Sequence, residues 1–227
     1  MSFGVIQFPD FDKSEAVYYA LNDVLKTDVE KVWYEDLSQF PYEALFVSSG
    51  THWLKYLKIH QIEAHFLEAL FNFAEKGGYI FGIGEGFRLL CELQLLPGRF
   101  QINKKEHFLS RSIFLKVDNS DAAFTALVDK TGCLKIPLSC YEGRYMANEA
   151  ELMNMRQNKQ ILFRYCDDKA HVSEKINYTG STDNIAAIRN NKGNVYGILP
   201  SIELAVDDFT GNSDGRYIFE SILAWIR

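Results

Sequence analysis

The sequence lacks the patterns that mark several specialised classes of protein. It has 24 basic residues against 30 acidic ones, and the net charge of −6 argues against a surface for binding nucleic-acid phosphates. No apolar run reaches the length of a membrane span, and the first ten residues lack the basic, apolar and small-residue order of a signal peptide. We therefore expect a cytoplasmic protein with no membrane and no nucleic-acid partner.

Metal-binding and disulfide patterns are also missing. The four cysteines, Cys91, Cys133, Cys140 and Cys166, show no C-x-x-C spacing, and His52, His60 and His65 are spaced so that they do not share one helical face. This argues against a zinc motif and favours free thiols over a disulfide framework. We expect no metal and no cofactor.

What is present is the alternation typical of an α/β protein. Short apolar runs alternate with longer amphipathic ones, which favours a three-layer α/β/α arrangement around an open, mostly parallel sheet. No repeat or linker divides the 227 residues, so one domain over residues 1–227 is expected. Ser14 is interpreted as the cap of the first helix, and Asn148 with Glu151 as a capping box. Strands are predicted over 3–8, 29–33, 44–47, 79–83, 112–117, 133–138, 161–165, 186–189 and 195–199, and helices over 14–26, 61–76, 87–94, 148–157 and 215–225.

The most informative segment is Phe81-Gly82-Ile83-Gly84-Glu85-Gly86-Phe87. A strand that enters a turn with glycines two before and two after a central residue has the backbone pattern of a nucleophile elbow. The central residue is normally Ser or Cys, and backbone amides near it stabilise an oxyanion. Alone, the pattern also fits a plain tight turn. A dinucleotide-binding loop fits less well, because that loop belongs to the first strand–helix unit and requires a third, later glycine.

Other segments match in the same order along the chain. They are residues 3–9, 82–90, 92–98, 142–145, 184–188, 193–200 and 214–215. Together they resemble the class I glutamine amidotransferases, and among them the glutaminase subunits of phosphoribosylformylglycinamidine synthase, an enzyme of purine biosynthesis. The resemblance spans nearly the whole chain. It implies the amidotransferase fold and, as a partner, the synthetase subunit of that enzyme.

The resemblance also implies a catalytic triad whose reactive members are missing here. Family members attack the glutamine side-chain amide with a cysteine thiolate, with histidine as the base and glutamate to orient it. The corresponding positions in this chain are Gly84, Ser201 and Glu203. Glycine has no side chain with which to attack, and serine is a poor proton acceptor near neutral pH. The resemblance therefore predicts a vestigial triad in which only Glu203 is retained, as a structural acceptor.

Further departures surround the triad. Ser48-Ser49-Gly50 replaces the family's P-G-G in the oxyanion loop, and Asp10-Phe11-Asp12 replaces G-S-N after the first strand. Arg88 stands where the family has a glutamine-contacting residue, and Leu204 replaces an arginine. Because the changes fall at separate places, we interpret them as natural degeneration of the site rather than as one engineered substitution.

Three functions remain open at this point. The first is a non-catalytic scaffold or regulatory subunit that holds the synthetase subunit while free ammonia supplies nitrogen, or equally an interaction module that has left the purine pathway. The second is a binding protein for a small carboxylate or amino acid. The third is an active glutaminase whose nucleophile has moved to Cys140, a residue that we place on a loop bordering the pocket. Cys91 is expected to face the core and Glu85 to be a solvated charge at the pocket edge. The predicted ligand pocket comprises Ser49, Gly50, Glu85, Arg88, Cys140, Glu142, Gly143, Arg144 and Tyr145.

Overall fold

The apolar runs of the chain form strands of one central sheet. The computed structural model describes residues 2–8, 13–36, 41–49, 63–129 and 132–226, and within them the sheet has nine strands in the order β2-β1-β3-β4-β11-β10-β9-β6-β7. Two further strands, β5 and β8, pair with each other. The bounds are β1 Phe3–Gln7, β2 Val29–Trp33, β3 Ala44–Ser49, β4 Tyr79–Gly84, β5 Arg99–Gln101, β6 Leu109–Val117, β7 Leu134–Cys140, β8 Arg144–Met146, β9 Ile161–Cys166, β10 Ile185–Arg189 and β11 Val195–Ile198.

The sheet is mixed, with a parallel part and an antiparallel part. The strands from β2 to β11 in the sheet order are parallel to their neighbours, and those from β11 to β7 are antiparallel. Parallel neighbours need long crossover connections, and helices supply them in the parallel part, whereas β10 and β11 are joined by the short turn expected around residues 191–194. The carboxyl ends of β3 and β4 therefore lie at one edge of the sheet.

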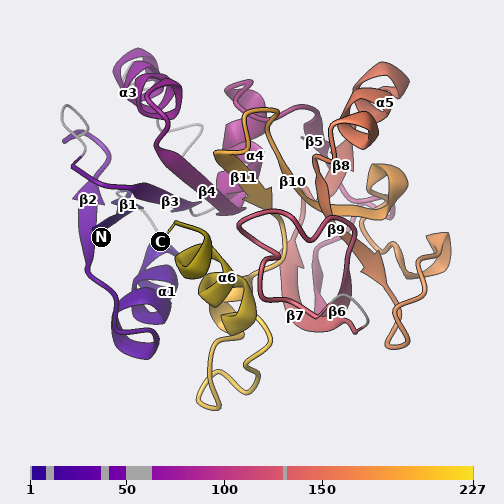
Figure 1. Ribbon diagram of the computed structural model, residues 1–227. Coiled ribbons are helices and arrows are strands. Elements are labelled where there is room, and N and C mark those ends of the chain that lie inside the picture. The colour runs from indigo at the N-terminus through magenta and orange to yellow at the C-terminus, as the bar shows by residue number, and fades with distance from the viewer. Residues whose placement is uncertain (1, 9–12, 37–40, 50–62, 130–131, 227) are drawn as a thin grey trace.

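Helices cover both faces of the sheet, which confirms the expected α/β/α layers. Figure 1 shows α3 and α4 on one face, and α1 and α6 on the other. None of the helices in the described ranges is long and apolar enough to cross a membrane. The bounds are α1 Ser14–Tyr19, its π-helical continuation η1 Ala20–Val24, α3 Glu63–Glu75, α4 Glu85–Glu92, α5 Glu149–Gln157 and α6 Arg216–Ile226.

Several boundaries differ from the sequence-based expectations. The cap of the first helix was predicted wrongly: Ser14 is the first residue inside α1, and Lys13 at the cap position has helical backbone angles and no capping side chain. Helix α4 begins at Glu85, directly after the turn. By contrast, the capping box of Asn148 and Glu151 is confirmed, with both reciprocal hydrogen bonds present.

The strands around the pocket were also placed incompletely. Strand β7 extends to Cys140, so this cysteine lies in a strand and not on a loop. Arg144 and Tyr145, for which no strand was predicted, pair with β5 as part of β8. Both strands of this small sheet are three residues long, which leaves little periodicity to detect in the sequence.

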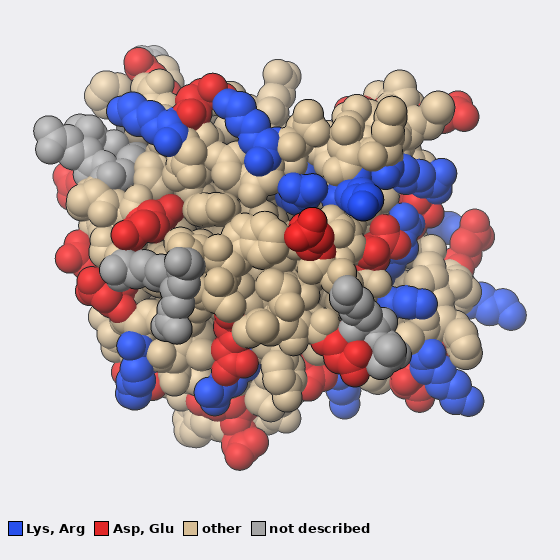
Figure 2. Space-filling view, in the orientation of Figure 1, with Lys and Arg blue, Asp and Glu red and all other residues tan. Residues whose placement is uncertain are grey.

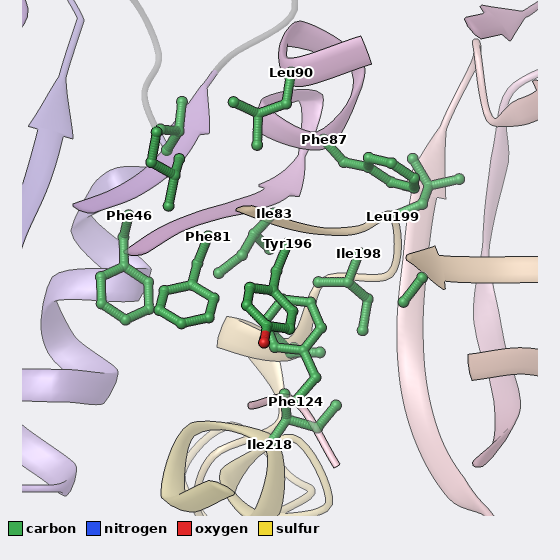
Figure 3. Packing of buried hydrophobic residues seen from close by; sticks show 14 of the residues in the cluster. Phe46, Phe81, Ile83, Phe87, Leu90, Phe124, Tyr196, Ile198, Leu199 and Ile218 are labelled. Carbon is green, nitrogen blue, oxygen red and sulfur yellow. The ribbon is translucent and has the colours of Figure 1, made fainter. Parts of the chain in front are cut away.

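Aromatic side chains fill the space between the central strands and α6. The ring of Phe81 in β4 lies 5.2 Å from the ring of Phe46 in β3 and 5.2 Å from that of Tyr196 in β11. Figure 3 shows these rings on the α6 side of the strands, with Phe124 and Ile218 beneath them. This packing fixes β4 and β11, and the candidate site begins where those two strands end.

Candidate functional site

The elbow expected from the glycine pattern is a sharp turn between β4 and α4. Gly84 has φ +61° and ψ −117°, and Glu85 follows as the first residue of α4. Residues other than glycine are strained in this conformation, and strained backbone is a feature of a nucleophile elbow. Of the described atoms, only the Leu199 carbonyl oxygen would lie within 4 Å of a Cβ at this position, at 3.9 Å. The turn thus has the backbone for a nucleophile and room for one, but Gly84 supplies no side chain.

A second glycine determines how closely α4 packs on the sheet. A Cβ on Gly86 would overlap the carbonyl oxygen of Val47 in β3, and a Cβ on Gly82 would lie 2.6 Å from Leu90 Cδ1. Helix α4 can therefore rest directly on β3 and β4, as Figure 1 shows. This close approach places the first turn of α4 at the carboxyl end of β4, where Gly84 lies.

The positions of the base and the orienting acid lie after β11. Ser201 is buried, and its backbone N–H donates to the Pro137 carbonyl oxygen at 2.8 Å. Glu203, in the short 3-10 helix η4 (Ile202–Leu204), is 1% exposed. Burial raises the pKa of Glu203 to about 7. Its Oε2 has no hydrogen-bond partner among the described residues, so Glu203 is only partly satisfied as an acceptor.

Arg88 is held by three carboxylates. Its Nη1 lies 3.2 Å from Glu85 Oε2 and also contacts Glu142 Oε2, and its Nε lies 3.2 Å from Glu92 Oε1. The three acidic side chains are 15–34% exposed, so water screens these contacts only in part. Burial raises the pKa of Glu85, and the charge of Arg88 opposes that rise. Arg88 is therefore already neutralised, and Glu85 is a partly buried ion-pair member rather than a solvated charge.

Lys13 adds a positive charge that no sequence motif indicated. The charge of its ammonium group lowers the pKa values of Glu85, Cys140 and Glu203 against the raising effect of burial. The segment before it, Asp10-Phe11-Asp12, lies outside the described residues. A lysine at the start of α1 thus contributes to the electrostatics of the site around Glu203.

Cys140 is buried at the end of β7. Burial, followed by the charge of Glu85, raises the pKa of its thiol to about 12. Asn103 fixes the turn that follows, since its Nδ2 donates to the Cys140 carbonyl oxygen at 2.9 Å and its Oδ1 accepts from the Gly143 N–H at 2.9 Å. Asn103 is 1% exposed and lies 37 residues before Cys140, with no motif around it, so sequence reasoning missed its role.

The predicted pocket residues are only partly brought together. Glu142 and Arg144 line a cavity of about 440 Å³, and Arg144 Nε is buried with no hydrogen-bond partner in the described part of the chain. Ser49 ends β3, and Gly50 lies outside the described residues. The other residues around this cavity are Phe100, Gln101, Ile102, Asn103, Lys104 and Glu106.

Tyr145 was placed in the pocket wrongly. It is 1% exposed, its ring stacks on Phe87 at 5.6 Å, and its hydroxyl donates to the Pro97 carbonyl oxygen at 2.9 Å. Tyr145 is therefore a core residue that joins β8 to α4. Cys91 is buried, as expected, and its thiol donates to the same carbonyl oxygen at 3.5 Å.

The described ranges contain no group of three or more His, Cys, Asp or Glu side chains that could hold a metal ion. The four cysteines are free. What the site offers chemically is a buried carboxylate, an arginine already held by three carboxylates, and a turn whose central residue has no side chain.

Comparison with known proteins gives one consistent family. A family model described as a CobB/CobQ-like glutamine amidotransferase domain matches residues 43–225. The phosphoribosylformylglycinamidine synthase subunit PurQ of Aquifex aeolicus (strain VF5) is 38% identical over 226 residues, which cover 99% of this chain and 100% of that protein. The protein of the same name from Moorella thermoacetica is also 38% identical, with 99% of this chain and 96% of that protein covered.

A solved structure has the same fold. The structure of PurLQS from Thermotoga maritima contains a chain that matches this one with a TM-score of 0.83 at 28% identity, covering 100% of this chain and 99% of that chain. The family match covers most of the sequence, and the PurQ relatives match over nearly their full length. The chain therefore belongs to the class I glutamine amidotransferase family, as a PurQ-like member.

Proposed function

We propose that this chain is a non-catalytic PurQ-like subunit of a phosphoribosylformylglycinamidine synthase, serving purine biosynthesis as a scaffold or regulatory subunit. The observation that carries the proposal is the turn at Gly84, which keeps the elbow conformation but has no side chain at the reacting position. The names of the relatives support the assignment to this synthase.

The residues around the turn support the lack of glutaminase activity. Covalent catalysis requires a nucleophile activated by a base, and the base position holds a buried serine. A serine hydroxyl does not take up a proton near neutral pH, so Glu203 has no imidazolium to stabilise. The site thus has neither a nucleophile at Gly84 nor a base at Ser201.

Cys140 does not replace the missing nucleophile. The thiolate is the reactive form of cysteine, and a thiol with a pKa of about 12 is almost entirely protonated at neutral pH. The thiol is also buried, which limits access by a substrate amide. A glutaminase reaction through Cys140 would need both obstacles removed.

The test is to combine the chain with the synthetase subunit from the same organism and supply either glutamine or ammonium chloride. We expect a complex that forms product with ammonium and none above background with glutamine. An intact PurQ from a relative, such as that of Aquifex aeolicus, is the positive control for glutamine. Failure to bind the synthetase subunit would overturn the scaffold role. Ammonia release from glutamine that disappears in Cys140→Ala would overturn the lack of catalysis.

A second candidate function is the binding of a small carboxylate or amino acid. The observation in its favour is the cavity in which Arg144 Nε has no described partner and Lys104 adds a second positive charge. Arg88 supports it less, because three carboxylates already occupy its guanidinium group. Calorimetry with a panel of amino acids and dicarboxylates tests this function. Flat titrations for wild type would exclude it, and heat that Arg144→Met removes would support it.

A further inference from the structure

The cavity beside the small sheet of β5 and β8 has a lining rich in charged side chains. Its volume is about 440 Å³, which is within the range of small-molecule sites. Gln101 in β5 pairs directly with Arg144 in β8, so these two side chains lie on the same face of the strand pair. Figure 1 shows β5 and β8 beside α4. The charged residues in the lining are Lys104, Glu106, Glu142 and Arg144.

Three of these four charges lack a counter-charge. Glu142 contacts Arg88, whereas Lys104, Glu106 and Arg144 form no ion pair in the part of the chain that the structure describes. The Nε of Arg144 is moreover buried without a hydrogen-bond partner among the described residues. A buried donor that is left unsatisfied destabilises the protein, so an anion that accepted a hydrogen bond from Arg144 would be bound favourably.

The turn that carries Lys104 and Glu106 is held by hydrogen bonds. The Glu106 N–H donates to the Asn103 carbonyl oxygen at 2.8 Å, and the Lys104 N–H donates to the Thr179 carbonyl oxygen at 2.9 Å. The Asn103 side-chain amide also donates to the His107 carbonyl oxygen at 3.0 Å. Glu106 has φ +54°, an unfavourable conformation for glutamate of the kind that is found most often at functional sites. Because the backbone of this turn is fixed, binding through its side chains would order only the side chains themselves.

The three unpaired charges indicate the chemical class of ligand that the cavity would take. Lys104 and Arg144 can each pair with a carboxylate, and the guanidinium group of arginine can do so through two hydrogen bonds. Glu106 can accept a hydrogen bond from an ammonium group. A dicarboxylate without an amine would leave Glu106 unpaired, and an amino acid with a neutral side chain would leave one cation unpaired. An amino acid with a second carboxylate pairs with all three.

We propose that this cavity binds an acidic amino acid, with its two carboxylates paired to Arg144 and Lys104 and its ammonium group paired to Glu106. The inference rests on the second candidate function, since it names which small carboxylate the cavity selects. On the face that Figure 2 shows, basic and acidic side chains are interspersed, so no broad region of one charge there would attract anions in general. The selectivity therefore depends on the three side chains in the lining.

The experiment compares three matched ligands by calorimetry with the full chain. Glutamate carries all three charged groups, glutarate lacks the ammonium group, and glutamine has a neutral amide in place of the second carboxylate. We expect glutamate to bind at least about tenfold more tightly than glutarate or glutamine, because each of these loses one charge-assisted hydrogen bond.

Variants of the lining then assign each contact. Glu106→Gln is expected to raise the dissociation constant of glutamate about tenfold and to leave that of glutarate unchanged, because only glutamate carries the ammonium group. Arg144→Met is expected to weaken the binding of both ligands. Lys105→Met is the matched control: Lys105 is exposed and does not line the cavity, so both dissociation constants should stay as in wild type. Thermal unfolding of each variant checks that the fold is unchanged.

The outcomes separate this inference from the function on which it rests. If wild type gives no heat with any amino acid or dicarboxylate, the second candidate function itself fails. If glutarate or glutamine binds as tightly as glutamate, that function stands and the ligand class is wrong. If Glu106→Gln weakens glutarate as much as glutamate, Glu106 does not contact the ammonium group. Binding of glutamate that Arg144→Met leaves unchanged would lie outside this cavity and would overturn the inference.

Discussion

The elbow, residues 82–87, lies beside a wall of charged side chains formed by Arg88, Glu92 and Glu142, and the two regions differ in what they keep. The elbow has the backbone of a nucleophile turn, with Gly84 at φ +61° and Gly86 against the Val47 carbonyl oxygen. The wall has an arginine enclosed by carboxylates at a position where the resemblance implies a contact with glutamine. The backbone of the elbow thus has the geometry that a nucleophile turn requires, whereas the side chains of the wall differ from those that the resemblance implies.

The difference follows from what each part does for folding. Gly82 and Gly86 lie where α4 meets the sheet, and a Cβ at either position would overlap backbone or a core side chain. The wall side chains are partly exposed, and they can exchange partners without disturbing the core. Substitutions in the wall therefore disturb the packing little, whereas the elbow glycines are needed for the fold.

The largest expected effect comes from adding one methyl group to the elbow at Gly86. In an ordinary helix Gly→Ala would stabilise by about 1 kcal/mol. Here the methyl group would overlap the Val47 carbonyl oxygen, so we expect Gly86→Ala to lower the free energy of unfolding by about 4 kcal/mol or more. Gly84→Ala, with open space but a positive φ, should cost only about 1–3 kcal/mol. Urea unfolding of both variants measures the difference, and equal losses would contradict a packing role for Gly86.

The backbone turn of the elbow could be predicted from the sequence, whereas the contacts of the wall could not. Glycines at fixed spacing between a strand and a helix report a local backbone requirement, which a short sequence window contains. The network of Arg88 depends on Glu142, which is distant in sequence, and Asn103 supports the turn after Cys140 across 37 residues. Lys13 reaches the site from the start of α1, again with no local signal. The same limit hid β5 and β8, whose short pairing is visible only in three dimensions.

A second test uses pH to examine the buried carboxyl group of Glu203. Its pKa rises from 4.5 to about 7 on folding, so the folded protein binds more protons than the unfolded chain between these values. The contribution of Glu203 to the free energy of unfolding is therefore greatest below pH 4.5 and is lost as the pH rises through 7. The shift corresponds to about 3 kcal/mol. We expect Glu203→Gln to be close to wild type at pH 5 and more stable than it at pH 8.

Urea unfolding of wild type and Glu203→Gln across pH 4.5–8 measures this difference. Glu220→Gln, which removes a surface ion pair with Arg216 in α6, is the control and should give a curve parallel to that of wild type. The curves of unfolding free energy against pH for Glu203→Gln and wild type should therefore diverge. If they are parallel, the folded protein stabilises the ionised Glu203 carboxylate, contrary to what its unpaired oxygen indicates.

The smallest effect is expected in the wall, where Arg88→Met keeps the aliphatic length but removes the charge. Glu85, Glu92 and Glu142 would then face one another without a cation, and the partly buried Glu85 would be the most affected. We expect a loss of about 1–2 kcal/mol in urea unfolding at pH 8, with part of it recovered at pH 5 as Glu85 takes up a proton. Arg156→Met, which breaks an ion pair of a 56% exposed arginine with Asp183, should cost less than about 1 kcal/mol. If Arg88→Met lowers the free energy of unfolding as much as Gly86→Ala does, the wall is as necessary for folding as the elbow. The contrast between elbow and wall would then not hold.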